Sequence, residues 1–297
     1  LILGDQSSLI LDEYHPYDDL PKMINPTSGY IFNTNNSPFN STAEFENLKE
    51  EDYNSTFSFM EEENNRSVRF MELIDDYEKL SYEDFKEIKY DQQYPDSILY
   101  IGNISQIFDL DKSEFPSYEN LIDLIQNWDR RGDIENIGAA QWSLYYSYML
   151  DVLSENDLNV KDTIDIKFHL DALEKTKDRL MKNFGKLDIR LGDIQRLVRG
   201  DKSLPVSGLI DMIAPTYSVP MEGGKVRAVS GESYIMLIKY SEDGPEVETV
   251  LPYGNSSNPS SPHYTDQMKM YTEKKLKKMS LDKDEILSQA VRIYSPN

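Results

Sequence analysis

The chain has 297 residues, and its 31 lysines and arginines against 53 aspartates and glutamates give a formal net charge of −22. A surface this negative repels phosphate backbones and anionic lipid headgroups, so we expect no nucleic-acid partner. Cysteine is absent, which excludes disulfides and thiolate chemistry. No apolar run approaches the ~18 residues of a membrane span, and the first residues do not resemble a signal peptide, so we expect a piece cut from a longer chain.

Residues 1–65 are predicted to form a strand and a loop. Four X-Pro pairs between His15 and Pro38 disfavour helix at the residues that precede each proline. Between these pairs, Ser28–Asn33 has the apolar weight of one short buried strand. Residues 40–66 are rich in Asn, Ser, Thr and Glu, which is typical of a long irregular loop.

Residues 66–200 are predicted to form a helical segment. Apolar residues recur there at spacings of three and four, the period of an amphipathic helix. The second helix should begin at Ser81, with Asp84 completing a capping box, and the third should begin at Ser117 after Pro116. Gly185 is well suited to end the last helix. The predicted helices are 66–80, one from Ser81, one after Ser117, 138–153 and 166–184.

Residues 201–297 are predicted to form antiparallel strands and a closing helix. Period-two patterning indicates strands at 226–229, 234–240 and 247–253. Asp243-Gly244 is a strong hairpin signal between the last two strands. A helix over 282–294 would turn Ile286, Leu287, Ala290 and Ile293 inward. The order of elements indicates an α+β fold.

Generic catalytic motifs do not reveal the function. The three histidines, His15, His169 and His263, are far apart and lack metal-binding spacing. No glycine-rich phosphate loop, dinucleotide fingerprint or serine-hydrolase elbow is present. Acid pairs are abundant, but in a chain with 53 acids they are more often solvated surface.

Three stretches of the sequence rise above this background. Residues 25–38 read NPTSGYIFNTNNSP, residues 191–200 read LGDIQRLVRG with Leu-Pro at 204–205, and SGESYIM at 230–236 precedes LPYGNSSNPSSPHYTDQ at 251–267. Each stretch resembles a segment of the penicillin amidase family, and the three occur in the family's order. The resemblance covers residues 15–290.

The resemblance implies an N-terminal-nucleophile hydrolase with a four-layer α/β/β/α sandwich, of which residues 1–297 would be the C-terminal part of the large chain. A precursor of that kind cleaves itself to free a serine whose own α-amino group acts as base. That serine would lie upstream of Leu1, so this fragment alone is expected to be inactive. Its partners would be the remainder of its precursor and a small-molecule acyl-amide substrate, and its location periplasmic or extracellular. Penicillins, acyl-homoserine lactones and lipopeptides are all candidate substrates.

The resemblance also implies two site residues. The family's oxyanion donor, an asparagine two residues before Ser-Pro, corresponds to Asn35; a cluster of asparagines that only makes turn hydrogen bonds is the alternative. An arginine that holds the active-site network corresponds best to Arg69, with Arg66 as second choice. His263 is better interpreted as a residue that ties a long loop than as a catalytic base.

No cofactor is expected to be required. Some family members hold calcium near the nucleophile-bearing sheets, and Glu44 and Glu46 are the acids of this chain in the corresponding region. Calcium in the full enzyme is therefore a prediction whose remaining ligands would come from outside this chain.

Two other functions stay open at this point. The Tyr-rich, Asn-rich and acidic composition also fits a secreted glycan-binding or ligand-binding protein without catalysis. A degenerate acylase that is retained for assembly is a third interpretation.

Overall fold

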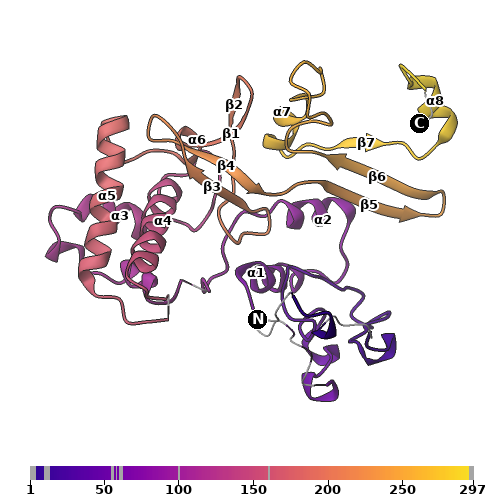
Figure 1. Cartoon of the computed structure of the whole chain (residues 1–297), viewed down its shortest axis with the longest axis horizontal. Coiled ribbons are helices and arrows are strands. Elements are labelled where there is room, and N and C mark those ends of the chain that lie inside the picture. Colours follow the sequence, from indigo (N-terminus) through magenta and orange to yellow (C-terminus); the bar gives the residue numbers. More distant parts are fainter. Residues whose placement is uncertain are drawn as a thin grey trace.

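The computed structural model describes residues 5–9, 14–54, 57, 59, 63–99, 101–159 and 161–293. Figure 1 shows a helical part, a central sheet and a second sheet that follow one another along the long axis, with the N-terminal loops below them. Helices and mainly antiparallel strands occur together, so the α+β class predicted from the sequence is confirmed. Among the described residues, no helix has both the length and the apolar character needed to cross a bilayer.

The α-helices are α1 Asn65–Ile74, α2 Tyr82–Lys89, α3 Glu119–Gln126, α4 Ala139–Glu155, α5 Ile166–Phe184, α6 Leu191–Ile194, α7 Met268–Thr272 and α8 Lys283–Gln289. The strands are β1 Gln195–Arg199, β2 Lys202–Pro205, β3 Thr216–Pro220, β4 Val226–Gly231, β5 Ile235–Ser241, β6 Gly244–Val250 and β7 Lys277–Met279. Short 3₁₀ helices occupy Ser7–Leu9, Tyr17–Asp19, Glu44–Glu46, Glu50–Asp52, Gly102–Phe108 and Lys112–Glu114.

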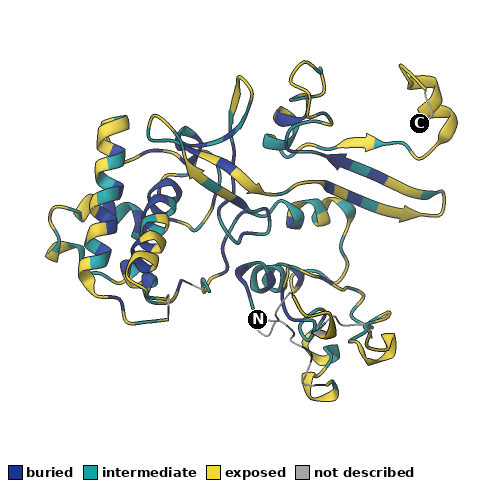
Figure 2. Cartoon of the chain, viewed as in Figure 1, coloured by how far each residue is buried: buried dark blue, intermediate teal, exposed yellow. Residues whose placement is uncertain are grey.

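The main hydrophobic core lies in the helical part. Helix α4 is contacted by α3, α5 and α6, and its buried face carries Trp142 and Tyr145. Figure 2 shows the corresponding buried stripe on α4 and the exposed outer face of α5. Each large apolar side chain buried here stabilises the fold by roughly 1.5–3 kcal/mol. The core therefore holds α4 firmly as a wall for the neighbouring sheet.

The two long helices predicted from the sequence are confirmed. Helix α5 spans the predicted residues and ends where Gly185 adopts φ 71°, with its N–H donating to the Met181 carbonyl at 3.0 Å. The capping box of α2 is also confirmed, because the Asp84 N–H donates to Ser81 Oγ and the Ser81 N–H to Asp84 Oδ2. Helix α1 ends at Ile74 rather than at residue 80.

The strands form two small sheets. Strand order is β2-β1-β4-β3 in the first sheet, where β1 and β4 run parallel, and β5-β6-β7 in the second. The predicted hairpin between β5 and β6 is confirmed, with Ser241 paired to Gly244 and Glu242-Asp243 in the turn. Strand β1 lies inside the segment that the sequence predicted as helical.

Three local predictions are wrong. Ser28–Asn33 forms no strand, although Phe32 is buried. The Phe32 N–H donates to the Ser41 carbonyl at 2.9 Å, and the Tyr30 carbonyl accepts from the Thr42 hydroxyl at 2.8 Å, but these bonds do not form a strand ladder. Ser117 does not cap α3, because the N-cap position is Tyr118, which makes no side-chain capping bond. Helix α8 is shorter than predicted and does not turn its apolar residues inward, since Ile286 is 50% and Leu287 42% exposed.

Candidate active site

Asn35 lies in a strained turn that is fastened to the start of α1. Its backbone has φ 65°, and its N–H donates to Asn33 Oδ1 at 2.8 Å. Asn64, the N-cap of α1, donates from Nδ2 to the Thr34 carbonyl at 2.9 Å. Asparagine tolerates the left-handed region better than other non-glycine residues. The turn therefore has a fixed position relative to α1.

Arg66 determines how the Asn35 side chain is oriented. Its Nη1 donates to Asn35 Oδ1 at 3.1 Å. Because a guanidinium has only donors, the amide atom that it contacts must be the oxygen. The Asn35 Nδ2 group consequently points away from Arg66 and donates to no described residue. The side-chain NH2 group of Asn35 is thus held in place and available to an acceptor.

Asp211 in turn holds Arg66. Arg66 Nε donates to Asp211 Oδ1 at 2.9 Å, and Asp211 Oδ2 accepts from both the N–H and Nδ2 of Asn65 at 2.9 Å. The side chains of Arg66 and Asp211 are 22% and 19% exposed. Asp211 also has a left-handed backbone, with φ 60°. Arg66 therefore bonds to two non-glycine residues with a left-handed backbone, Asn35 and Asp211. Backbone strain of this kind is common at functional sites.

These groups line a cavity of about 340 Å³ that also has aromatic walls. The tyrosines are Tyr94, Tyr146 and Tyr217. Burial, with a smaller contribution from the Asp211 carboxylate, raises the pKa of Tyr146 to about 12. Tyr146 is therefore an uncharged phenol at neutral pH. The cavity combines one ion pair, one available amide and an aromatic lining.

Arg69, the first choice from the sequence, is not brought together with Asn35. Its Nε and Nη2 donate to Asp91 at 3.1 and 3.2 Å, and its Nη1 donates to Glu72 at 3.1 Å. Burial alone would lower the pKa of Arg69, but the bonds to Asp91 and Glu72 raise it. Arg69 thus fastens α1 to the segment after α2, whereas Arg66, the second choice, contacts Asn35.

Sequence reasoning missed Asp211 and Asn65. Asp211 is one of 53 acids and lies 145 residues from Arg66, so no spacing links them. Asn65 is next to the arginine, yet its neighbours are equally polar. No local signal distinguishes either residue.

His263 has the structural environment expected for a residue that ties a loop. Its Nδ1 lies 2.8 Å from Asp266 Oδ2, three residues away, and its side chain is 66% exposed. Nearby, the Arg199 guanidinium lies over the rings of Tyr253 and Tyr264, at 4.8 and 4.4 Å. This arginine joins the second and third stretches that were singled out in the sequence.

The described residues do not supply a calcium site. The Glu46 carboxylate accepts bonds from the Thr27 hydroxyl, from the Thr27 N–H at 2.6 Å and from the Ser28 N–H at 3.0 Å. Within the described ranges, no group of three acidic, histidine or cysteine side chains could hold a metal. Calcium prefers six to eight oxygen ligands, which Glu44 and Glu46 alone do not provide.

Hydrogen bonds to the Glu46 carboxylate stabilise the loop that precedes Asn35, and this stabilisation depends on pH. Hydrogen bonds, led by that of the Thr27 hydroxyl, lower the pKa of Glu46 to about 2, whereas an unperturbed glutamate has a pKa near 4.5. A lowered folded-state pKa stabilises the fold above the unfolded pKa, and this contribution disappears as pH falls towards 2. We expect Glu46→Gln to lower the melting temperature at pH 7 and to match wild type near pH 2. A difference in melting temperature that is independent of pH would contradict this assignment.

Comparison with known proteins identifies the family. The sequence model of the penicillin amidase family matches residues 2–288. The chain belongs to the penicillin amidase family. Membership agrees with the N-terminal-nucleophile hydrolase class that the resemblance implied, and the described residues form helices and two small sheets.

Curated relatives within the family are acylases. The acyl-homoserine lactone acylase PvdQ of Pseudomonas fluorescens is 37% identical over 83 residues, which are 27% of this chain and 11% of that protein. PvdQ of Pseudomonas syringae pv. tomato is 26% identical over 168 residues, 50% of this chain and 22% of that protein. The aculeacin-A acylase of Actinoplanes utahensis is 29% identical over 94 residues, 28% of this chain and 11% of that protein. The chain thus matches a quarter or less of the length of these relatives.

A solved structure of the thermostable penicillin G acylase from Alcaligenes faecalis is similar over 95% of this chain and 60% of that chain. The TM-score is 0.45 and the sequence identity 14%.

Proposed function

We propose that this chain is the C-terminal part of the large chain of an acylase, an enzyme that hydrolyses a linear acyl-amide bond. Membership in the penicillin amidase family and the acylase activity named for its relatives support this function. The nucleophile in the proposal is a serine at the start of the large chain, outside these residues. The proposed partners are the remainder of the precursor and a small acyl-amide substrate, and the proposed location is periplasmic or extracellular.

The proposed reaction proceeds through an acyl-enzyme. The serine oxygen attacks the amide carbonyl carbon, and the carbonyl oxygen becomes an oxyanion. The C–N bond then breaks, the amine leaves with the proton taken from the serine, and water hydrolyses the ester to a carboxylic acid. A donor aimed at the developing oxyanion stabilises the transition state more than the substrate.

Asn35 is the proposed oxyanion donor, and one observation carries this role. Arg66 donates a hydrogen bond to the amide oxygen of Asn35, so the Asn35 Nδ2 group remains available to an acceptor in the cavity. A donor held in advance contributes about 3–4 kcal/mol to transition-state stabilisation. Arg66 is then a positioning residue, and Asp211 holds Arg66.

The experiment is an acyl-release assay on the complete enzyme. Benzylpenicillin, a long-chain N-acyl-homoserine lactone and a cyclic lipopeptide are incubated separately, and mass spectrometry measures the carboxylic acid and the amine. The proposal expects both products in equal amounts from at least one substrate. An enzyme that has undergone self-cleavage but releases no acid from any N-acyl amide would overturn it.

A further inference from the structure

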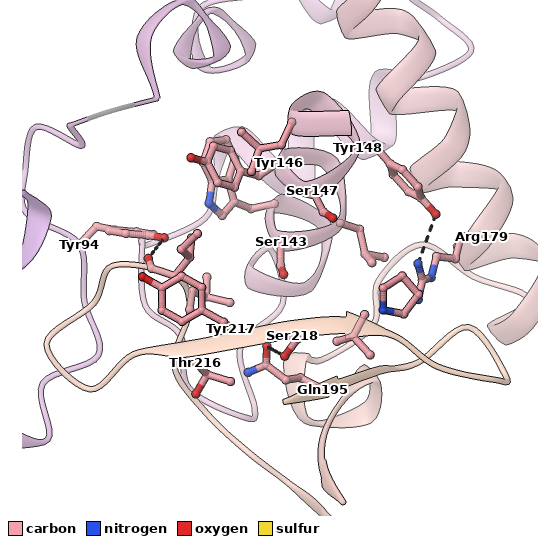
Figure 3. Close-up of a pocket in the computed structure, with 17 residues that line it drawn as sticks. Tyr94, Ser143, Tyr146, Ser147, Tyr148, Arg179, Gln195, Thr216, Tyr217 and Ser218 are labelled. Atoms are coloured by element: carbon pink, nitrogen blue, oxygen red, sulfur yellow. Dashed lines mark hydrogen bonds between the residues drawn. The ribbon is translucent and has the colours of Figure 1, made fainter. Parts of the chain in front are cut away.

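A second cavity, of about 150 Å³, lies between α4 and β3. Figure 3 shows Ser143, Tyr146 and Ser147 of α4 on one side, and Tyr217 and Ser218 of β3 on the other. The hydroxyls of Ser143 and Ser147 bond to no described residue. Aromatic and hydroxyl groups therefore share this lining, which suits a ligand with an apolar body and polar ends.

The second cavity adjoins the cavity of Asn35. Tyr94, Tyr146, Ile210 and Tyr217 line both cavities. Tyr94 is almost fully buried, and its hydroxyl donates to the Ile210 carbonyl at 2.5 Å, which fixes this shared wall. Because the same four residues line both cavities, one extended substrate can contact both.

Arg179 of α5 lies at the opposite end of the second cavity. In Figure 3 the pair Arg179 and Tyr148 is on one side, and Tyr94 and Tyr217 are on the other. Arg179 donates to the carbonyls of Gly224 at 2.9 Å and Lys225 at 2.7 Å, and to the Tyr148 hydroxyl at 3.3 Å. A guanidinium has five N–H donors, so two remain.

No carboxylate within the described residues pairs with Arg179, although the chain contains 53 acids. The side chain is half-buried, so its positive charge is only partly solvated. Arginine with unused donors is well suited to bind a carboxylate with charge-assisted hydrogen bonds. Arg130, Arg196, Arg199 and Arg227 also form no ion pair among the described residues, but of these arginines only Arg179 lines the cavity. Its position at the end of the cavity indicates a place for an anion from outside the chain.

We propose that the cavity between α4 and β3 is a substrate subsite that binds a carboxylate-bearing part of the amide substrate. The apolar body would lie against Trp142 and Tyr146, and the carboxylate would bond to Arg179. This inference rests on the proposed acylase function, and it names the class of substrate: an amide with a carboxylate on its acyl or its amine side.

The test uses the complete enzyme and three chromogenic probes. One is a neutral N-octanoyl-4-nitroanilide, the second carries a carboxylate on the nitroaniline ring, and the third carries one at the far end of the acyl chain. The last two distinguish an amine-side from an acyl-side anion. Wild type is expected to have a higher kcat/KM for one carboxylated probe than for the neutral one.

The main variant is Arg179→Gln. It is expected to lower kcat/KM for the preferred carboxylated probe by about 10- to 100-fold, since a hydrogen bond to a charged group contributes about 1.5–3 kcal/mol. The value for the neutral probe should stay within about twofold. Arg227→Gln is the matched control, because Arg227 is an exposed arginine of β4 that is absent from the cavity lining. The control should leave the ratio of the two probes unchanged.

A second variant tests the cavity without removing the bonds of Arg179. Ser143→Phe removes no hydrogen bond of the described residues and places a ring in the cavity. It should raise KM for the preferred carboxylated probe at least tenfold, and it should also raise KM for the neutral probe, because the apolar body of either probe would lie in this cavity. Equal losses for all three probes in Arg179→Gln, or an unchanged KM in Ser143→Phe, would overturn the subsite. Wild type that hydrolyses none of the probes and none of the acyl-release substrates would overturn the acylase function instead.

Discussion

Replacing Asn35 with alanine in the complete enzyme is expected to lower kcat by about 10²–10³-fold while KM changes little. The loss is the amount that one preorganised oxyanion donor contributes in acyl transfer. KM should change little because the donor bonds more strongly to the oxyanion than to the ground-state carbonyl. The measurement is steady-state kinetics on whichever substrate releases acid in the assay above.

Asn25→Ala is the control for this variant. Asn25 is exposed and also has a left-handed backbone, with φ 49°, so alanine meets a similar conformational cost there. Asn25 is not part of the cavity lining. The control should keep wild-type kcat. If Asn35→Ala keeps wild-type kcat as well, Asn35 is only a turn residue.

Replacement by glutamine is expected to lower kcat when it is made at Arg66, and to lower the free energy of unfolding when it is made at Arg69. Arg66→Gln removes the group that fixes the Asn35 oxygen, so kcat should fall by about tenfold or more while the fold persists, because Asn65 still donates two bonds to Asp211. Arg69→Gln leaves the Asp91 carboxylate, which is 12% exposed, without its cation. Breaking such a pair costs on the order of 3 kcal/mol of unfolding free energy.

Denaturant titration and steady-state kinetics on both variants separate the two roles. Arg69→Gln should unfold at lower denaturant and keep its kcat at temperatures where it is folded. The assignment of Arg66 would be refuted if Arg69→Gln, while still folded, lost more turnover than Arg66→Gln. Arg66→Lys adds a check, since an ammonium cannot replace the planar geometry by which Arg66 bonds to Asn35 and Asp211.

The elements that the sequence predicted well depend on short-range interactions. The start of α2 is determined by Ser81 and Asp84, three residues apart, and the end of α5 by Gly185. Ser28–Asn33 was predicted as a strand from its apolar weight, but a strand also needs a partner, which no local pattern specifies. The apolar residues of α8 have the right period, yet none is buried among the described residues.

The candidate site was predictable only in part, and for a similar reason. Asn35 was predicted because its own segment, residues 25–38, resembles a segment of the family. Arg66 and Arg69 lie one turn apart on α1, so the sequence could not decide between them. The hydrogen-bond partners in the structure distinguish them. Arg66 bonds to Asp211 and Asn35, whereas Arg69 bonds to Asp91 and Glu72. Those partners come from other segments of the chain.

The bond between Arg66 and Asp211 also bears on the order in which the molecule matures. It closes a loop of 145 residues, and contacts with such separation form late because the entropy of closure must first be overcome. A nascent chain that has emerged only as far as α5 can form α1, but it lacks the carboxylate that holds Arg66. The amide of Asn35 therefore acquires its fixed direction only after the segment before β3 has folded, so the oxyanion donor that we propose depends on the completion of folding.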